Sequence, residues 1–269
     1  MNKTLWYLKH LNVWASAIDS RFFDGKISRN ALPKRCQCNV CNRKFHNYRV
    51  HGNHSELSLE YETLGMGRRI SDCPYCGAPD KHRILLWVLK NKTRILNSKC
   101  SVLHFAPEHT IRNELIKNVE MNYVSGDLEP GRADRVVDMT CMPFDDNSFD
   151  YVIASMVLEH ISDENKGLQE IYRVLKPNGV AVLTVPIVKG RKCFEDASIV
   201  SASDRLRLFG QEDHVRLYGD DLKAHFSNLW TGSVKIERIE EDLSRRELKR
   251  LGAEGKLPVI LLGKFKTSN

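Results

Sequence analysis

The sequence predicts an α/β protein organised around a parallel sheet, and two observations carry this prediction. Four short apolar runs have the character of strands, at residues 123–127, 135–138, 151–154 and 180–185, and the first two end in aspartate. A segment with helical spacing of apolar residues lies between the last two runs. Strands that alternate with helical connections form parallel βαβ units, and ligands bind at the carboxyl ends of such strands. The sequence therefore predicts a small-ligand site at that edge of the sheet.

The helix between the last two runs is indicated by the positions of Leu168, Ile171, Tyr172 and Leu175, which share one face of a helix. The turn at 176–179 has the sequence Lys-Pro-Asn-Gly. Proline cannot continue a helix, and asparagine or glycine can adopt positive φ, so we expect the helix to end there.

The remaining elements of the predicted sheet lie on either side of this region. Residues 101–105 form the first strand, and a helix at 111–118 follows it. Residues 234–239 and 259–265 are expected to close the sheet as a strand pair. The charged stretch 240–256 between them is most simply a solvated helix.

Length and charge limit the classes of protein to be considered. A chain of 269 residues accommodates one sizeable α/β domain and a smaller module. It contains no apolar run near the ~20 residues that span a membrane, and we expect a cytoplasmic protein. Residues 1–99 carry 18 Lys and Arg against 7 Asp and Glu, which makes the N-terminal third strongly basic within a net charge of +7. This asymmetry suggests an anionic partner, although a solvated basic surface explains it equally well.

Two Cys-x-x-Cys pairs, Cys38/Cys41 and Cys73/Cys76, predict a structural zinc site. Each pair forms a tight knuckle, and two knuckles complete a tetrahedron of thiolates around Zn²⁺. Gly77 after the second pair suits a knuckle because glycine tolerates positive φ. A redox pair is the main alternative, but it would not explain two pairs.

The ligand set of this zinc site has alternatives. The 31 residues between the pairs exceed the spacing of about 15–20 that is typical, so a loop must be inserted. Cys36 could replace Cys38, and His46, His51 or His54 could replace a cysteine.

The chain is therefore expected to have three parts. Residues 1–35 form a basic leader, either a docking helix or a weak membrane-surface helix. Residues 36–80 form a zinc-ribbon-like module, and residues 81–269 form the α/β domain. Within that domain the connection 187–233 is too long for a bare loop, so we expect a partly helical lid or substrate insertion.

The α/β part resembles the class I S-adenosylmethionine-dependent methyltransferases. The residues that carry the resemblance lie at 102–108, 126–127, 138–150, 157–161 and 170–179. The match covers roughly residues 100–190 and is most specific from Pro143 to Gly179. It implies a Rossmann-like sheet with parallel strands and a C-terminal antiparallel strand pair, and an enzyme that binds S-adenosylmethionine.

The resemblance also implies a set of cofactor-binding residues. Asp127, with Leu128 beside it, would bind the ribose hydroxyls, and Asp138 the adenine amine, with Met139 beside the ring. Ser155 and Met156 would line the cofactor near the reacting centre. The first turn would face the methionine part of the cofactor, and its residues are His104, Phe105, Ala106, Pro107 and Glu108.

This first turn departs from the family pattern. The family usually has Gly-x-Gly where this chain has Phe105-Ala106-Pro107-Glu108. Ala106 is small enough for close approach of a ligand, and Glu108 could accept from the cofactor's ammonium group, but Pro107 removes a backbone donor. The chain is similar to a subgroup with this same turn, a paired-cysteine N-terminal module and a later segment at 209–219. We therefore expect the turn to be a working variant, whereas His104, inside a strand, also fits a hydrogen-bonded core residue.

His214 and His160 are the candidate catalytic residues. His214 lies in the lid segment among Glu212, Asp213 and Arg216, and histidine can take a proton near neutral pH. Alternatively His214 shapes the lid, and His160 with Glu159 orients the start of a helix.

Three functions are compatible with these observations. The first is methylation of an O or N acceptor on a small molecule, glycan or sugar intermediate. The second is an RNA methyltransferase whose basic zinc module grips phosphates. The third is a non-catalytic binding protein, which only the glycine-free turn suggests. Since function must be argued from the site, we favour the first.

Overall fold

The computed structural model describes residues 35–53, 55–254 and 256–265. The leader that the sequence suggests for residues 1–35 lies outside the described residues, apart from Arg35.

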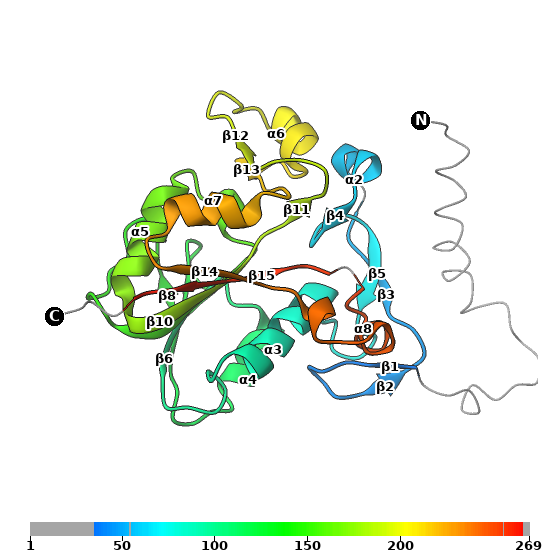
Figure 1. Ribbon diagram of the computed structural model, residues 1–269, viewed down its shortest axis with the longest axis horizontal. Helices are drawn as coiled ribbons and strands as arrows, with labels where there is room; N and C mark the ends of the chain where they lie inside the picture. Colours follow the sequence, from blue (N-terminus) through cyan, green and yellow to red (C-terminus); the bar gives the residue numbers. More distant parts are fainter. Residues whose placement is uncertain (1–34, 54, 255, 266–269) are drawn as a thin grey trace, which may run out of the picture.

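A seven-stranded sheet forms the centre of the molecule, in the order β14-β15-β10-β9-β6-β7-β8 (Figure 1). Its strands are β6 (Ser101–Phe105), β7 (Asn122–Asp127), β8 (Arg135–Val136), β9 (Phe149–Ser155), β10 (Leu175–Thr184), β14 (Ser233–Glu237) and β15 (Val259–Gly263). Strands β6 to β10 are parallel, and β15 runs antiparallel to both β10 and β14. The predicted α/β fold, a Rossmann-like parallel sheet with a C-terminal antiparallel pair, is confirmed.

Helices cover both faces of the sheet (Figure 1). Helices α3 (Asp80–Lys92) and α4 (His109–Leu115) lie on one face, and α5 (Glu164–Val174) and α7 (Leu222–Leu229) on the other. Asp163 caps α5 by accepting from the backbone N–H of Lys166. The helix ends at Val174, directly before β10. The predicted turn at 176–179 is instead an irregular start of β10, where the register shifts between Leu175 and Val180 and Asn178 has a φ of 66°.

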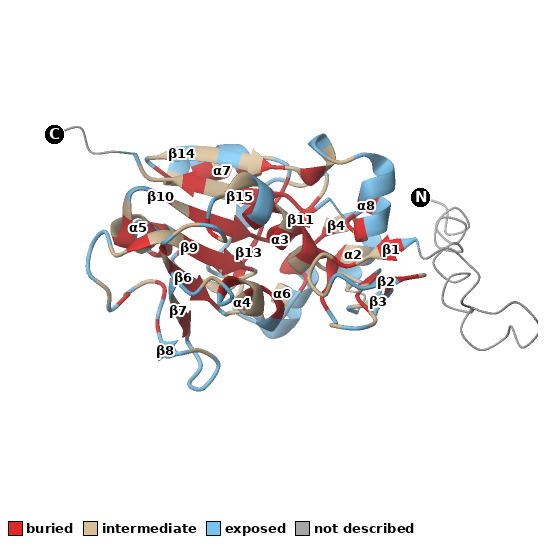
Figure 2. Cartoon of the chain, turned by 90° about the horizontal axis from the view of Figure 1, so that it is seen from below, coloured by how far each residue is buried: buried red, intermediate tan, exposed pale blue. Residues whose placement is uncertain are grey.

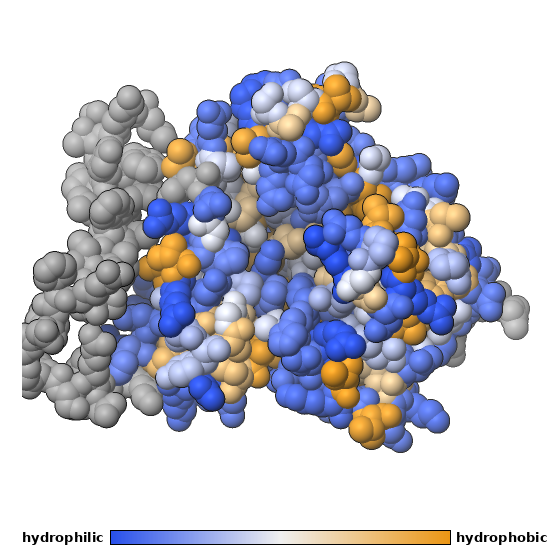
Figure 3. Space-filling view, turned by 180° about the vertical axis from the view of Figure 1, so that it is seen from behind, coloured by the Kyte–Doolittle hydropathy of each residue, from blue (hydrophilic) through white to orange (hydrophobic). Residues whose placement is uncertain are grey.

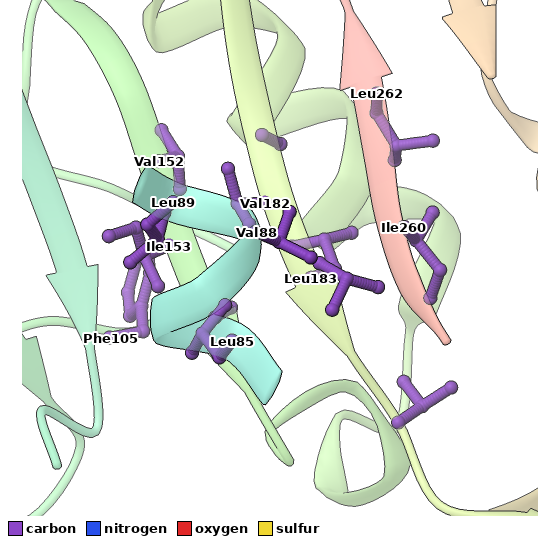
Figure 4. Close-up of a cluster of buried hydrophobic side chains, with 14 of the residues drawn as sticks. Leu85, Val88, Leu89, Phe105, Val152, Ile153, Val182, Leu183, Ile260 and Leu262 are labelled. Atoms are coloured by element: carbon purple, nitrogen blue, oxygen red, sulfur yellow. The ribbon is translucent and has the colours of Figure 1, made fainter. Parts of the chain in front are cut away.

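The core lies on both faces of the sheet, and Figure 2 shows much of the central strands as buried. Leu85, Val88 and Leu89 of α3 pack against the sheet, as Figure 4 shows. Their labelled neighbours are Phe105, Val152, Ile153, Val182, Leu183, Ile260 and Leu262. Truncating one of these side chains to alanine typically costs about 2–5 kcal/mol, so the sheet is a firm support for its loops.

The cysteine-rich module is built from short hairpins and has little core of its own. Its elements are β1 (Cys36–Gln37), β2 (Lys44–Phe45), β3 (Arg49–His51), α2 (Glu56–Glu60), β4 (Thr63–Leu64) and β5 (Arg69–Asp72). Strand β1 pairs with β2, and β3 with β5, both antiparallel. A small cluster around Phe45, Tyr48 and Ala78 is buried beside the cysteines.

The stretch 240–256 is not simply a solvated helix as the sequence suggested. It contains the short 3₁₀ helix η2 (Ile239–Glu241) and α8 (Arg245–Leu251), and α8 packs against β1 of the module. Leu248 and Leu251 are buried, and Gly252 ends the helix at a φ of 63° with Tyr48 directly against it. The apolar residues are too few among the charges for their burial to be recognised from the sequence.

The connection 187–233 is partly helical, as expected. It holds β11 (Ile187–Val188), β12 (Phe194–Glu195), α6 (Ala202–Phe209), β13 (Arg216–Leu217) and α7. Strand β11 pairs with β4, and a small apolar cluster that includes Leu57, Val188, Phe209 and Leu217 joins the two regions. The insertion between the cysteine pairs and the lid therefore form one layer, which lies beside the sheet in Figure 1.

The surface in Figure 3 is mostly hydrophilic, with apolar side chains scattered over it. Within the described ranges, every helix is too short or too polar to cross a membrane.

Replacing Gly252 by alanine tests the docking of α8. A Cβ at Gly252 would lie 2.3 Å from the Tyr48 ring, whereas one at Gly131, which also has positive φ, meets nothing within 4 Å. We expect Gly252→Ala to lower the free energy of unfolding by about 2–4 kcal/mol, against ~1 for Gly131→Ala, in urea titration. If both variants lost the same free energy of unfolding, the close packing of α8 against Tyr48 of the module would be contradicted.

Candidate functional site

The candidate site lies where β6, β7 and β9 end. Strand β6 has β7 on one side and β9 on the other, so the chain reverses its direction of travel across the sheet at this point. In open α/β sheets such a switch point leaves a crevice at the carboxyl ends of the strands, and ligands bind there.

The first turn adopts a positive φ, which lets a ligand approach the backbone closely, although it contains no glycine. Ala106 has a φ of 43°, and its N–H donates to the carbonyl of Gly126 at 2.8 Å. A positive φ costs a residue with a side chain about 1 kcal/mol or more, and such conformations are concentrated at functional sites. Ala106 is exposed and Pro107 half-buried, whereas Phe105 is buried and supports the turn from below.

Glu108 is the central charged group of this turn. Its Oε2 accepts from Nε2 of His104 at 2.9 Å, and Nε2 of His82 lies 3.8 Å from Oε1. Burial raises the pKa of Glu108, but His104 and His82 outweigh that effect and hold the pKa at about 2. Oε1 is buried and has no hydrogen-bond partner among the described residues. A carboxylate of this kind can accept from a cationic group that enters the site.

His104 serves the turn from inside the sheet. Its side chain has no exposed surface, and Nδ1 lies 3.0 Å from the hydroxyl of Tyr123. Because a carboxylate only accepts, Nε2 carries the proton toward Glu108, and Nδ1 accepts from Tyr123. Both ring nitrogens are therefore occupied. The side chain of His104 therefore contacts Glu108 and Tyr123, as the alternative of a hydrogen-bonded core residue predicts, and its contact with a cofactor stays a prediction.

Lys81 and His82, at the start of α3, are site residues that the sequence analysis missed. Nδ1 of His82 is 2.7 Å from the hydroxyl of Thr110, and burial lowers the pKa of His82 to about 4. Burial also lowers the pKa of Lys81, which lies in the field of Glu108 and Glu159. The signal available was the run Asp-Lys-His-Arg at a helix start just after a cysteine knuckle, but sequence alone could not show which strand end it meets.

Asp127 and Asp138 follow β7 and β8. Oδ1 of Asp127 accepts from the N–H of Glu129 at 2.9 Å, and Oδ1 of Asp138 accepts from the N–H and hydroxyl of Thr140 at 2.8 Å. These bonds fix each carboxylate through one oxygen and leave Oδ2 for a ligand hydroxyl or amine. Leu128 is 68% exposed beside Asp127, whereas Met139 is buried.

Ser155 and Met156 end β9 next to the first turn. The hydroxyl of Thr184 donates to Ser155 Oγ at 3.0 Å, and the nearby Ser155 side chain contributes to the low pKa of Glu108. Met156 has a φ of 57°. A Cβ built on Gly65, which has a φ of 79°, would lie 2.7 Å from Met156 Cε. The segment between the two cysteine pairs, which contains Gly65, therefore packs against Met156.

His160 and His214, the two catalytic candidates from the sequence, lie beside each other where the lid meets the 3₁₀ helix η1 (Leu158–His160). Their rings lie 4.9 Å apart, and Nδ1 of His160 is 3.2 Å from Oδ2 of Asp213. His214 is buried, its Nδ1 donates to the carbonyl of Phe209 at 3.1 Å, and burial lowers its pKa to about 4. Glu159 beside them is buried as well, which raises its pKa to about 8.

Arg216 holds this lid segment on the sheet. Its buried guanidinium donates to the carbonyls of Leu158 and Ile161 in and after the 3₁₀ helix η1 (Leu158–His160). The N–H of Val215 donates to the carbonyl of Glu159 at 2.9 Å. The positions of the two histidines therefore follow from backbone contacts rather than from a mobile loop.

The four cysteines of the two pairs converge. Sγ of Cys38 lies 3.7 Å from that of Cys76, and Sγ of Cys41 lies 3.6 Å from that of Cys73. All four sulfurs are within 4.8 Å of one another, and a ZnS₄ tetrahedron with bonds of about 2.3 Å has sulfurs about 3.8 Å apart. The N–H of Gly77, at a φ of 72°, donates to the carbonyl of Cys73 at 2.9 Å, as in the predicted knuckle.

The alternative ligands are engaged differently. The thiol of Cys36 donates to the carbonyl of His46, and Nδ1 of His51 lies 2.9 Å from Asp72. His54 lies outside the described residues. The donor set that fits a tetrahedral ion is therefore the one formed by the two pairs.

The chain is similar in sequence to known methyltransferases. Residues 103–183 match the family described as "Methyltransferase domain". The chain is 26% identical over 197 residues to the ubiquinone/menaquinone biosynthesis C-methyltransferase UbiE of Legionella pneumophila, which covers 71% of this chain and 73% of that protein. It is 41% identical over 86 residues to a demethylmenaquinone methyltransferase of Clavibacter sepedonicus, with coverage of 26% and 35%.

Two solved structures are similar to part of this chain. The YcgJ protein of Bacillus subtilis superposes with a TM-score of 0.45 at 17% identity, over 69% of this chain and 100% of that one. Phosphoethanolamine N-methyltransferase 2 of Haemonchus contortus, in complex with S-adenosyl-L-methionine, gives 0.45 at 16% identity, over 74% and 54%.

The low pKa of His82 predicts a specific dependence of stability on pH. In the folded protein His82 binds its proton near pH 4, whereas the unfolded chain does so near 6.5. Between these values the unfolded chain binds more protons, so the free energy of unfolding falls on acidification. At pH 5 this group alone accounts for a loss of about 2 kcal/mol relative to pH 7.

The His82→Gln variant isolates this contribution, because glutamine can still hydrogen-bond Thr110 but does not titrate. We expect urea unfolding of the variant between pH 7 and pH 5 to show a smaller loss than the wild type. Identical losses would mean that His82 is protonated alike in both states.

Proposed function

We propose that this chain, which resembles the class I S-adenosylmethionine-dependent methyltransferases and matches a methyltransferase domain over residues 103–183, methylates a small molecule held between the strand ends and the lid. The observation that carries the proposal is the carboxylate of Glu108, whose Oε1 is buried. It is fixed by His104 and keeps Oε1 without a partner in the first turn. Glu108 Oε1 would accept from the ammonium group of the methionine part of the cofactor.

The rest of the cofactor fits the other carboxylates along this edge. Asp127 is proposed to take the ribose hydroxyls and Asp138 the adenine amine, each through the oxygen that its own turn leaves free. Exposed Leu128 and buried Met139 would flank the adenosine on its two sides. The glycine-free turn is compatible with this arrangement because Ala106 already adopts positive φ.

The bound cofactor supplies an electrophilic methyl group, and this chain's residues would supply alignment and exclusion of water. Ser155 and Met156 border the reacting centre, and Gly65 of the insertion packs on Met156. His160 and His214 are proposed to act on the acceptor side of the centre, where the lid meets the strand ends.

The acceptor is proposed to be a small molecule with a hydroxyl group. The sequence analysis favours an oxygen or nitrogen acceptor, such as that of a sugar intermediate, whereas the UbiE relatives are named C-methyltransferases. A conjugated ring that carries a hydroxyl group is compatible with methylation at oxygen and at carbon. Loss of the hydroxyl proton makes both the oxygen and the conjugated ring carbons more nucleophilic. Analysis of the methylated product would tell the two atoms apart.

The cysteine cluster is proposed to hold a structural Zn²⁺. The sulfur separations of 3.6 and 3.7 Å fit a closed ZnS₄ site, which has no open position for catalysis. Such an ion would fix the module, and through Asp80 and Arg83 the start of α3.

A nucleic-acid acceptor is the alternative proposal, and one observation favours it. The guanidinium of Arg43 lies 4.8 Å from the centre of the Tyr75 ring on the exposed side of the module, with Lys44 beside it. Other basic residues of this region are used inside the protein, since Arg69 pairs with Asp80 and Arg83 is fully buried. The small-molecule proposal therefore stands first.

Calorimetric titration with S-adenosylmethionine tests the proposal. We expect micromolar binding that Asp127→Asn or Glu108→Gln weakens about 10- to 100-fold, since a hydrogen bond to a charged group contributes about 1.5–3 kcal/mol. Glu120→Gln is the matched control, because Glu120 is exposed near the opposite end of β7. Absence of binding by folded wild-type protein would leave only the non-catalytic function.

Metal analysis of purified variants tests the zinc proposal. We expect one zinc per chain after dialysis against EDTA, lost in Cys73→Ser and retained in Cys36→Ser, since the Cys36 thiol bonds a carbonyl instead. Zinc that survives in Cys73→Ser would contradict the four-cysteine assignment.

A further inference from the structure

We propose that Glu159, His160 and His214 form a second metal site, which binds one divalent transition-metal ion beside the reacting centre. Its place in catalysis rests on the proposed function, but the binding of the ion does not. Each of the three residues offers one ligand atom, and these atoms lie within 4.8 Å of one another.

The site joins two segments that are distant in sequence. Glu159 and His160 belong to η1, just after β9, and His214 belongs to the lid. In a compact site with bonds of about 2.1 Å, neighbouring ligand atoms stand about 3 Å apart and opposite ones about 4.2 Å. Small side-chain rotations therefore bring the three ligand atoms around one ion, while the backbone contacts of Arg216 and Val215 remain.

The surroundings of the histidines match those of metal ligands. A ligating histidine usually presents its second ring nitrogen to a carboxylate or a backbone carbonyl. Nδ1 of His160 lies 3.2 Å from Asp213, and Nδ1 of His214 donates to the carbonyl of Phe209 at 3.1 Å. These contacts fix the rings and leave the Nε2 lone pairs for an ion.

Glu159 provides the independent observation that points to a ligand. The residue is 1% exposed, and its Oε2 is buried without a hydrogen-bond partner among the described residues. A buried carboxyl oxygen without a hydrogen-bond partner is unfavourable, and a bound cation would provide the missing partner.

The donor set and its charges indicate which ion binds and how tightly. Two imidazoles and one carboxylate suit Zn²⁺, Co²⁺ or Ni²⁺ better than Mg²⁺ or Ca²⁺. Lys81 and Arg216 lie near Glu159, and their positive charges repel a metal ion. We therefore expect this site to bind a metal ion more weakly than the four thiolates do. An ion with open positions could bind an acceptor hydroxyl and favour its deprotonated form.

Cobalt titration of the full-length, EDTA-dialysed protein tests this site without cofactor or acceptor. We expect one equivalent of Co²⁺ to bind at micromolar concentration by calorimetry, with a visible absorption band from nitrogen and oxygen ligation. The variants Glu159→Gln, His160→Gln and His214→Gln should each weaken binding at least tenfold. His109→Gln is the control, since His109 is an exposed histidine of α4.

The outcomes separate this proposal from the function above. Binding that all three variants retain, or no binding beyond the retained zinc, would overturn the metal site. Because His160 is partly exposed, its variant keeps the test valid if replacement of a buried ligand unfolds the protein. Titration of the same variants with S-adenosylhomocysteine reports independently on the cofactor site.

Discussion

The buried guanidinium of Arg83 is the contact on which the arrangement of the molecule depends. It donates to the carbonyls of Ala78, Leu251 and Gly252, and it lies 4.1 Å from the centre of the Tyr48 ring. One side chain thus joins the cysteine knuckle, the first turn of α3 and the end of α8. A buried cation without such acceptors would be strongly unfavourable, so the three segments assemble together or not at all.

The contacts of Arg83 also determine which residues of α3 lie at the candidate site. A bidentate ion pair between Arg69 and Asp80 fixes the first turn of α3, and Lys81 and His82 are the next two residues of the chain. The sheet contributes Glu108 and the strand ends, and the insertion between the cysteine pairs covers Met156 through Gly65. The N-terminal module therefore borders the candidate site, and a zinc ion held by its four cysteines would act on that site only through the backbone geometry of the module.

Sequence analysis predicted what is encoded locally. The strand runs, the helix before Lys-Pro-Asn-Gly, the closing strand pair and the convergence of the cysteines all follow from periodicity and spacing, and the structure has them. It could not predict contacts between distant segments. Helix α8 packs on the module through a few leucines among many charges, and Lys81 and His82 reach the strand ends only because Arg83 fixes α3. The orienting role of His104 was visible only once Tyr123 and Glu108 stood beside it.

Amide hydrogen exchange with and without S-adenosylhomocysteine tests the central claim most directly, namely that module and sheet form one site. We predict that the ligand slows exchange in the first turn at 104–108 and also in the insertion at 63–67, while β1 and β2 stay unchanged. Slowing confined to the sheet loops, with none in the insertion, would contradict the claim that the cysteine module forms a wall of the cofactor site.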